Sequence, residues 1–370
     1  MQLKKALCVL LALVLCLGCT ICAASGNEVY WEDLNVISFN VDGLPIPSFL
    51  SSTKRPAAKA TRLLAQQVKA AGCDILCAQE DFNYHGILSR ELDMRYGTVT
   101  SGPAVIGDGL NVFSRFPVYN VGRVPWEQAY GIFDCGSDEL TPKGILYCTI
   151  DLDGVYIDVY TLHADAWEDA DSILAKAAQF DQLMHLIETH SADRAVLLTG
   201  DFNVNYSIFH AGYRNGSYPV DLAQKLQDNF VSKGFSDAWI EANNDGCYDF
   251  TYSEMQQRYG CDYPRVWDTL DHIFYRSGAG VQLTLNDAQY ADFDCAGIDW
   301  PGHLSDHAAL CAQFTCTINP SKTTRPDALH AERIRPAAYL LRAVSSVAKT
   351  LWTVLRHLPD LVKNGIGWIK

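Results

Sequence analysis

Polar residues that could bind a metal ion or move a proton follow several apolar runs of this chain. The clearest run, residues 196–199, is followed by the sequence Gly-Asp-Phe-Asn at residues 200–203. A short apolar run of this kind predicts a buried strand, and the active sites of α/β enzymes form at the carboxyl ends of such strands. Asp201 and Asn203 are therefore candidate site residues.

Five other predicted strands have a carboxylate, amide or imidazole group at one end. These groups belong to Asn40, Glu80, His163, Asp271 and the adjacent pair Asp306 and His307. A hard divalent cation prefers oxygen ligands such as carboxylates and amides. The set therefore predicts a Mg²⁺ site, with Mn²⁺ or another divalent cation as the alternative. The two histidines add groups that titrate near neutral pH.

The elements that must position these residues alternate between strands and helices from residue 30 to residue 316. Apolar runs predict the strands, and apolar residues at helical spacing predict the helices. The predicted strands are 34–40, 75–78, 109–113, 145–150, 155–162, 196–199, 271–275 and 308–314, and the predicted helices are 56–71, 169–189 and 220–233. This order suits one α/β domain in which two packed sheets carry helices on their outer faces.

Taken in this order, the six strand-end motifs resemble those of the endonuclease/exonuclease/phosphatase superfamily, whose members cleave phosphate esters with a metal ion. The resemblance covers about residues 34–316. It implies the DNase I-like fold, an α/β architecture built as a four-layer α/β/β/α sandwich. In that fold two mixed sheets are flanked by helices, and the active site lies at one rim.

Three further segments are similar to the neutral sphingomyelinase branch of the superfamily. Residues 40–45, Asn-Val-Asp-Gly-Leu-Pro, look like its opening Asn-x-x-Gly-(Ile/Leu)-Pro signature. Residues 106–117, Ile-Gly-Asp-Gly-Leu-Asn-Val-Phe-Ser-Arg-Phe-Pro, resemble its Gly-x-Gly-Leu-x-Val-Phe-Ser-(Lys/Arg)-x-Pro segment. Residues 161–165, Thr-Leu-His-Ala-Asp, are similar to its Thr-His-Leu-His-Ala-Glu run. The resemblance implies a phospholipase C reaction that releases a phosphorylated headgroup from a membrane phospholipid.

The resemblance assigns the metal and phosphate ligands to particular residues. It implies that Glu80, assisted by Asn40, binds a catalytic Mg²⁺ that neutralises a phosphate oxygen and stabilises the leaving oxygen. Asp306 is the third metal ligand in this assignment. Together with Asp201 and Asn203, Asp306 would hold phosphate, water or a second ion.

The resemblance also assigns the groups that move protons. His307 would be the general base that takes a proton from the attacking water. Asp271 would accept a hydrogen bond from the ring of His307 and raise its basicity. His163 would donate to a phosphate oxygen as negative charge builds. Each of these side chains could instead cap a turn or fill the core, and His272 is expected to be structural.

The sequence therefore predicts a Mg²⁺-dependent phosphodiesterase, similar to a sphingomyelinase and acting as a monomer on membrane phospholipid. One alternative is a DNase-like nuclease on the same scaffold. The net charge of −14 argues against a nucleic-acid partner, because nucleic-acid-binding domains carry clustered basic residues. A second alternative is a membrane-surface binding protein without catalysis, but every expected catalytic group is present.

The first 25 residues have the layout of a secretory signal peptide. Lys4 and Lys5 precede an apolar stretch from Ala6 to Leu17, and small residues follow up to Ser25. We expect a secreted or cell-surface protein that acts outside the cytoplasm. A retained membrane anchor is the alternative.

Nine cysteines remain beyond the predicted signal peptide. Secretion would permit disulfides, and the odd number leaves at least one thiol unpaired within the chain. The local pairs expected from spacing are Cys135 with Cys148 and Cys247 with Cys261.

The tail, residues 317–370, differs from the domain in charge. Residues 321–370 carry nine Lys or Arg against three Asp or Glu, an excess of six positive charges that leaves about −20 on the rest of the chain. Basic residues recur at every seventh position from Arg342 to Lys370, which keeps them on one face of a helix. We expect an amphipathic helix that lies in a membrane interface with its cations toward anionic headgroups. The alternative is a helix docked on the domain surface.

Overall fold

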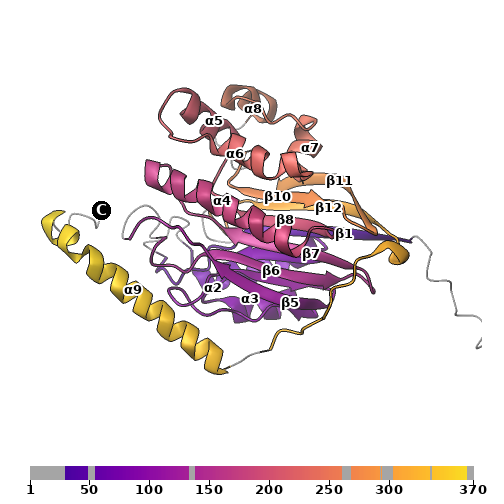
Figure 1. Cartoon of the computed structure of the whole chain (residues 1–370), viewed down its shortest axis with the longest axis horizontal. Helices are drawn as coiled ribbons and strands as arrows, with labels where there is room; N and C mark the ends of the chain where they lie inside the picture. The colour runs from indigo at the N-terminus through magenta and orange to yellow at the C-terminus, as the bar shows by residue number, and fades with distance from the viewer. Residues whose placement is uncertain are drawn as a thin grey trace, which may run out of the picture.

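Two six-stranded sheets pack face to face in the computed structural model (Figure 1). The structure describes residues 30–48, 55–132, 138–260, 268–291, 293, 303–333 and 336–364. The predicted signal peptide, residues 1–25, lies outside the described residues.

The first sheet has the strand order β11-β12-β1-β2-β4-β3. Its strands are β11 (Val281–Ala291), β12 (Ala309–Ile318), β1 (Tyr30–Asn40), β2 (Ile75–Gln79), β4 (Asn111–Ser114) and β3 (Tyr96–Gly97). β1 pairs in parallel with β2 and antiparallel with β12, so the sheet is mixed.

The second sheet has the order β5-β6-β7-β8-β10-β9. Its strands are β5 (Val118–Pro125), β6 (Gly144–Asp151), β7 (Tyr156–His163), β8 (Ala195–Asp201), β10 (Asp271–Arg276) and β9 (Ser236–Asp237). β7 and β8 are parallel, whereas β10 runs antiparallel to β8.

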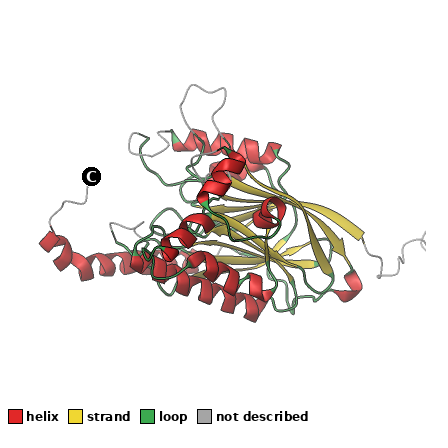
Figure 2. Cartoon of the chain, turned by 90° about the horizontal axis from the view of Figure 1, so that it is seen from above, coloured by secondary structure: helices red, strands yellow, loops and turns green. Residues whose placement is uncertain are grey.

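Helices cover the outer faces of both sheets, so the strands lie between helices (Figure 2). The helices are α2 (Ala57–Ala70), α3 (His85–Leu92), α4 (Ala170–His190), α5 (Tyr206–Arg214), α6 (Leu222–Asn229), α7 (Ala238–Asn244), α8 (Tyr252–Tyr259) and α9 (Pro336–Asn364). None of them, within the described residues, has the length and hydropathy needed to cross a membrane.

Successive residues of β1 serve two different cores, because neighbouring side chains of a strand point to opposite faces of its sheet. Leu34 and Val36 are fully buried in the core between the two sheets. Ile37 and Phe39 instead pack in a second core with residues of α2 and α3. A one-residue slip in register would exchange the two sets, so the apolar pattern specifies the pairing of β1.

The predicted four-layer sandwich of two mixed sheets with a C-terminal helix is confirmed. Every strand and helix expected from the sequence is present, with its ends shifted by a few residues. The elements that the sequence did not indicate are α3, α5, α7, α8, β3, β5, β9 and β11.

The prediction that Cys148 and Cys247 form disulfides is wrong. Cys148 is a free thiol buried in β6, and Cys247 is a free thiol on the surface. In the core a thiol behaves as a small apolar side chain, so Cys148 can pack there without forming a disulfide. The expected partners, residues 135 and 261, lie outside the described residues.

Candidate active site

Strand ends from both sheets meet at one rim of the sandwich. Asn40 ends β1 and Glu80 directly follows β2, its parallel neighbour. His163 ends β7 and lies opposite Asp201, the last residue of the parallel strand β8. The amide nitrogen of Asn40 donates to Asp201 Oδ2 (3.1 Å) and to Glu80 Oε1 (3.2 Å). One side chain therefore joins the two sheets at the site.

Asp201 is the centre of the polar network. Its Oδ2 lies 3.3 Å from Nε2 of His163, and its Oδ1 accepts the main-chain N–H of Asn203 at 2.9 Å. Burial alone would raise the pKa of Asp201, but the charges of His307 and Lys143 and the hydrogen bond from Asn40 bring it below its usual value. Asp201 is therefore ionised at neutral pH and holds donors around it.

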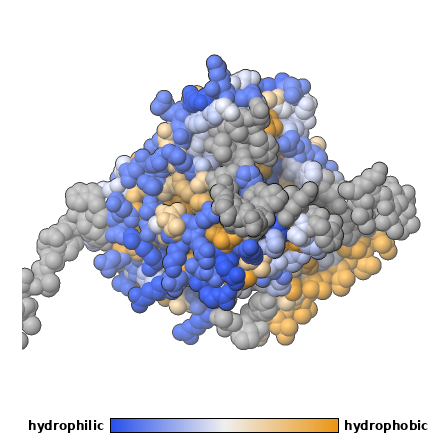
Figure 3. Space-filling model, turned by 180° about the vertical axis from the view of Figure 1, so that it is seen from behind, coloured by the Kyte–Doolittle hydropathy of each residue, from blue (hydrophilic) through white to orange (hydrophobic). Residues whose placement is uncertain are grey.

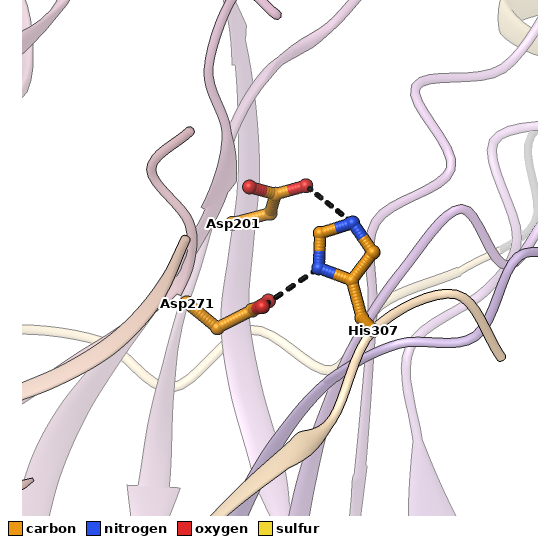
Figure 4. A group of neighbouring side chains, drawn as sticks. All are labelled: Asp201, Asp271 and His307. Atoms are coloured by element: carbon orange, nitrogen blue, oxygen red, sulfur yellow. Dashed lines mark hydrogen bonds and ion pairs between the residues drawn. The ribbon is translucent and has the colours of Figure 1, made fainter. Parts of the chain in front are cut away.

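His307 and Asp271 form a hydrogen-bonded pair beside Asp201 (Figure 4). Nδ1 of His307 lies 2.7 Å from Oδ2 of Asp271, and Nε2 lies 3.6 Å from Oδ2 of Asp201. Asp271 opens β10 directly opposite Asp201 in β8, so both carboxylates reach the same ring. Burial alone would lower the pKa of His307, but the charges of Asp271 and Asp201 raise it well above its usual value.

These three residues can be interpreted in two ways. Each offers one ligand atom, and the three atoms lie within 4.8 Å of one another, a spacing that could hold a metal ion. The hydrogen bond between Asp271 and Nδ1 favours a different role for His307, because it orients the ring and turns Nε2 toward the side of Asp201. This is the arrangement of a general base and the group that positions it.

Glu80 lies in the most acidic part of the site. Burial, followed by the charges of Asp306 and Asp42, raises the pKa of Glu80 to about 7. Burial and the charge of Asp306 also raise the pKa of Asp42 to about 6, although Arg55 forms an ion pair with Asp42. A divalent cation would relieve the repulsion among three carboxylates, and these oxygen donors suit Mg²⁺. Glu80 and Asp306 thus fit a Mg²⁺ site, while direct ligation by Asn40 stays a prediction.

Gly43 brings the chain after β1 into close contact with Glu80. The main-chain N–H of Gly43 donates to the carbonyl oxygen of Glu80 at 3.1 Å. A Cβ at position 43 would lie 2.4 Å from that oxygen, which is too close for any side chain. The Asn-x-x-Gly spacing of residues 40–43 therefore has a physical reason: Asn40 holds the carboxylate of Glu80 and Gly43 holds its main chain.

His163 is an uncharged member of the site. Burial, with the charge of Lys143, lowers the pKa of His163 to about 3. Its main-chain carbonyl accepts from Nε1 of the buried Trp126 at 2.7 Å, which holds the end of β7. Among the described residues Nδ1 of His163 is buried without a hydrogen-bond partner. Donation from His163 to a phosphate oxygen stays a prediction.

Lys143 is a charged group of the site that the sequence analysis missed. It is buried immediately before β6, and its Nζ lies 2.5 Å from Oδ1 of Asp138 and 3.4 Å from the carbonyl oxygen of Ala164. Burial alone would lower the pKa of Lys143, but the charge of Asp138 raises it. This cation lowers the pKa values of Asp201 and Glu80. Its only sequence signal is a lone lysine in a loop before a strand.

Asn203 is held by a second buried lysine. Its side-chain amide donates to the carbonyl oxygen of Ala164 at 3.1 Å, and its backbone has a left-handed φ of 53°. Lys176 of α4 is completely buried, and its Nζ donates to the carbonyl oxygens of Asn203 (3.0 Å) and Trp167 (2.6 Å). Lys176 therefore connects α4 to two loops at the rim of the site.

Replacing Lys176 by methionine should destabilise the fold by about 2–5 kcal/mol, because each buried carbonyl left without a donor costs roughly 1–3 kcal/mol. The free energy of unfolding in urea measures this loss. Lys233→Met, at a half-exposed lysine paired with Glu188, is the control and should change stability by less than about 1 kcal/mol. Equal effects of the two substitutions would contradict the connecting role of Lys176.

Comparisons with known proteins identify the family of this chain. The model of the Endonuclease/Exonuclease/phosphatase family matches residues 37–307, and the chain belongs to this family. A sphingomyelinase of Mycobacterium tuberculosis is 31% identical over 292 residues, which are 76% of this chain and 52% of that protein. The chain thus spans about half the length of the curated relatives it matches.

Solved structures share the fold at low sequence identity. Sphingomyelinase C from Streptomyces griseocarneus superposes with a TM-score of 0.50 and 18% identity, over 76% of this chain and 99% of that structure. D. rerio TDP2 in complex with a single-strand DNA product has a TM-score of 0.52 and 16% identity over the same shares. Because one of these structures is a sphingomyelinase and the other holds a DNA product, the fold alone does not distinguish a lipid from a nucleic-acid substrate.

Proposed function

We propose that this protein is a secreted, Mg²⁺-dependent phosphodiesterase that acts as a monomer and hydrolyses a membrane phospholipid in the manner of a sphingomyelinase. The reaction type is supported by the hydrogen-bonded pair of His307 and Asp271. This pair lies beside Asp201, at the same rim of the sandwich as the acidic group around Glu80. The sphingomyelinase relatives support the substrate class.

The reaction would begin with the attack of water on phosphorus. In its neutral form the ring of His307 accepts the proton of the water at Nε2, while the carboxylate of Asp271 holds Nδ1 and stabilises the imidazolium that results. The bond between phosphorus and the lipid alcohol breaks, the departing oxygen takes a proton from water, and His307 returns its proton to the solvent, so that the products are a phosphorylated headgroup and a free hydroxyl. Mg²⁺, when bound at Glu80 and Asp306, supplies charge that neutralises the phosphate oxygens.

The remaining residues position the phosphate and its neighbours. Asp201, ionised in the core, holds the side chains of Asn40 and His163 in place. The amide of Asn203 is held near the same carboxylate, because the main-chain N–H of Asn203 donates to Asp201. His163, kept neutral by burial, can donate a hydrogen bond to a phosphate oxygen without carrying charge into the site.

Incubation of the purified protein with sphingomyelin vesicles tests the proposal. With Mg²⁺ the protein should release phosphocholine, and with a chelator release should stop. Supercoiled plasmid DNA under the same conditions is the comparison substrate. Release of no phosphocholine under either condition would exclude the lipid substrate, and cleavage of the plasmid would then identify a nuclease on this scaffold.

A further inference from the structure

Helix α9 is attached to the domain with its apolar side facing outward. Figure 1 shows the helix extended along the lower side of the molecule, beside the sandwich rather than within it. From behind, the same helix presents a continuous hydrophobic band at the lower right (Figure 3). An apolar surface of this kind usually marks a binding face.

Small polar side chains and one ion pair, between Arg356 and Glu139 at 3.8 Å, make the contacts that hold α9 to the domain. Oγ of Ser346 donates to the carbonyl oxygen of Val105 at 2.6 Å, and Oγ1 of Thr350 donates to that of Leu140 at 3.5 Å. Thr353, one turn further on, is buried. A helix that packed on the domain through the hydrophobic effect would turn its leucines toward the domain. Helix α9 instead turns its polar face toward the domain and its leucines toward the solvent.

The apolar residues lie roughly opposite this attached face. Successive residues of an α-helix are about 100° apart around its axis. On this scale the mean direction of the apolar side chains is about 160° from that of Ser346, Thr350 and Thr353. Leu341, Trp352 and Leu355 are 70%, 68% and 60% exposed. Among the α9 side chains that the structure describes, the exposed large apolar residues are Leu340, Leu341, Val344, Val347, Leu351, Trp352, Leu355 and Leu358.

The charges of α9 point to an anionic partner. The helix contains four Lys or Arg against one Asp in a chain whose net charge is −14. Arg342, Lys349 and Arg356 lie between the attached face and the apolar face, on one side of the helix. Apolar residues flanked by cations are typical of a helix that lies in the interface of a bilayer with anionic lipids.

Both loops that hold α9 belong to the active-site end of the domain. Val105 lies in the loop before β4, and Gly109 of that loop accepts the main-chain N–H of Asp81, the residue after Glu80. Leu140 lies in the loop that carries Lys143 into the site. The helix is thus fixed near the rim where the strands end.

Loops at the same end of the domain expose further apolar side chains. The exposed residues on loops near the strand ends are Ile46, Val105, Tyr130 and Trp167. Trp167 is 64% exposed and follows β7 by four residues, on the loop held by Lys176. These side chains add exposed apolar surface at the end of the domain to which α9 is attached.

We propose that α9 is a membrane-binding element that inserts its outward apolar face into a bilayer containing anionic phospholipid. The rim with the catalytic residues then faces the same lipid surface. The inference rests on the proposed function for the choice of a lipid as partner, but it does not depend on which phospholipid is cleaved.

Sedimentation with vesicles that contain no sphingomyelin tests α9 separately from catalysis. The full protein should bind vesicles of phosphatidylcholine and phosphatidylglycerol more tightly than vesicles of phosphatidylcholine alone. The triple substitution Leu341→Gln, Trp352→Gln and Leu355→Gln should weaken binding by about 100-fold or more, since each inserted side chain contributes roughly tenfold. These side chains are exposed, so the thermal unfolding temperature should stay unchanged.

A matched control replaces three exposed apolar residues elsewhere. The control residues lie on α4, α5 and α8 and are Leu174, Tyr213 and Tyr259. Replacing all three by glutamine should leave vesicle binding intact. The proposal is overturned if the protein does not bind anionic vesicles, or if the α9 triple variant binds like the control. It is also overturned if sedimentation equilibrium shows a dimer that only the α9 substitutions dissociate, since the apolar face would then belong to a second copy.

Discussion

Replacing His307 by alanine should lower kcat on sphingomyelin vesicles by about 10²- to 10⁴-fold, the usual contribution of a general base. The reason is that Asp271 holds Nδ1 of His307 and so orients Nε2 of the ring beside the ionised Asp201. The unfolding free energy and the affinity for Mg²⁺ should change little, because His307 is half-buried and lies outside the predicted ligand set. Steady-state kinetics and denaturant unfolding measure the two effects.

A control and a companion substitution distinguish the base from a structural role. His185→Ala, at an exposed histidine of α4, should keep full activity. Asp271→Asn should lower kcat and also move the pH profile: the charge of Asp271 raises the pKa of His307, so its removal lets the neutral ring form at lower pH. Full activity of His307→Ala would show that another group is the base.

The positions of the strand-end residues could be predicted because they depend on local pattern and on general rules of sheets. Apolar runs place Asn40, Glu80, His163 and Asp201 after strands, and parallel neighbours put such ends at the same rim. The structure brings all four together and joins them through the amide of Asn40. The order of motifs along the chain was therefore enough to predict the family and the rim.

Residues whose roles depend on distant partners could not be predicted. Lys143 and Lys176 each look like ordinary surface lysines in the sequence, and only the folded chain shows that both are buried against carbonyl groups. Helix α5 was missed for a similar reason. The carboxylate of Asp268, 62 residues away, accepts the main-chain N–H of Tyr206 and so caps the start of the helix.

The orientation of α9 also required the structure. Both the membrane interpretation and the docked interpretation of the tail follow from its amphipathic pattern, because a pattern shows that a helix has two faces and not which one turns inward. The contacts of Ser346 and Thr350 show that the helix is attached to the domain through its polar side. The two interpretations are thus compatible: a helix held on the domain keeps its apolar face available.

Binding of Mg²⁺ should strengthen about tenfold per pH unit as the pH rises toward 7 and should level off above it. Burial and the charges of Asp306 and Asp42 raise the pKa of Glu80 to about 7 in the metal-free protein. Below that pH the carboxyl group is protonated, and the ion must displace the proton before it can bind. Isothermal titration of the metal-free protein with Mg²⁺ at pH 6, 7 and 8 measures this dependence.

Glu80→Gln removes both the charge and the titration, so it should weaken Mg²⁺ binding by at least about 100-fold, more than the loss of a group that only orients a ligand. The dependence on pH between 6 and 7 should become shallower in this variant. Asp93→Asn, at a 79% exposed carboxylate that ends α3, is the control and should bind Mg²⁺ like the unchanged protein. If Glu80→Gln kept the full pH dependence, the displaced proton would come from a neighbouring carboxyl such as Asp42, whose pKa is raised to about 6.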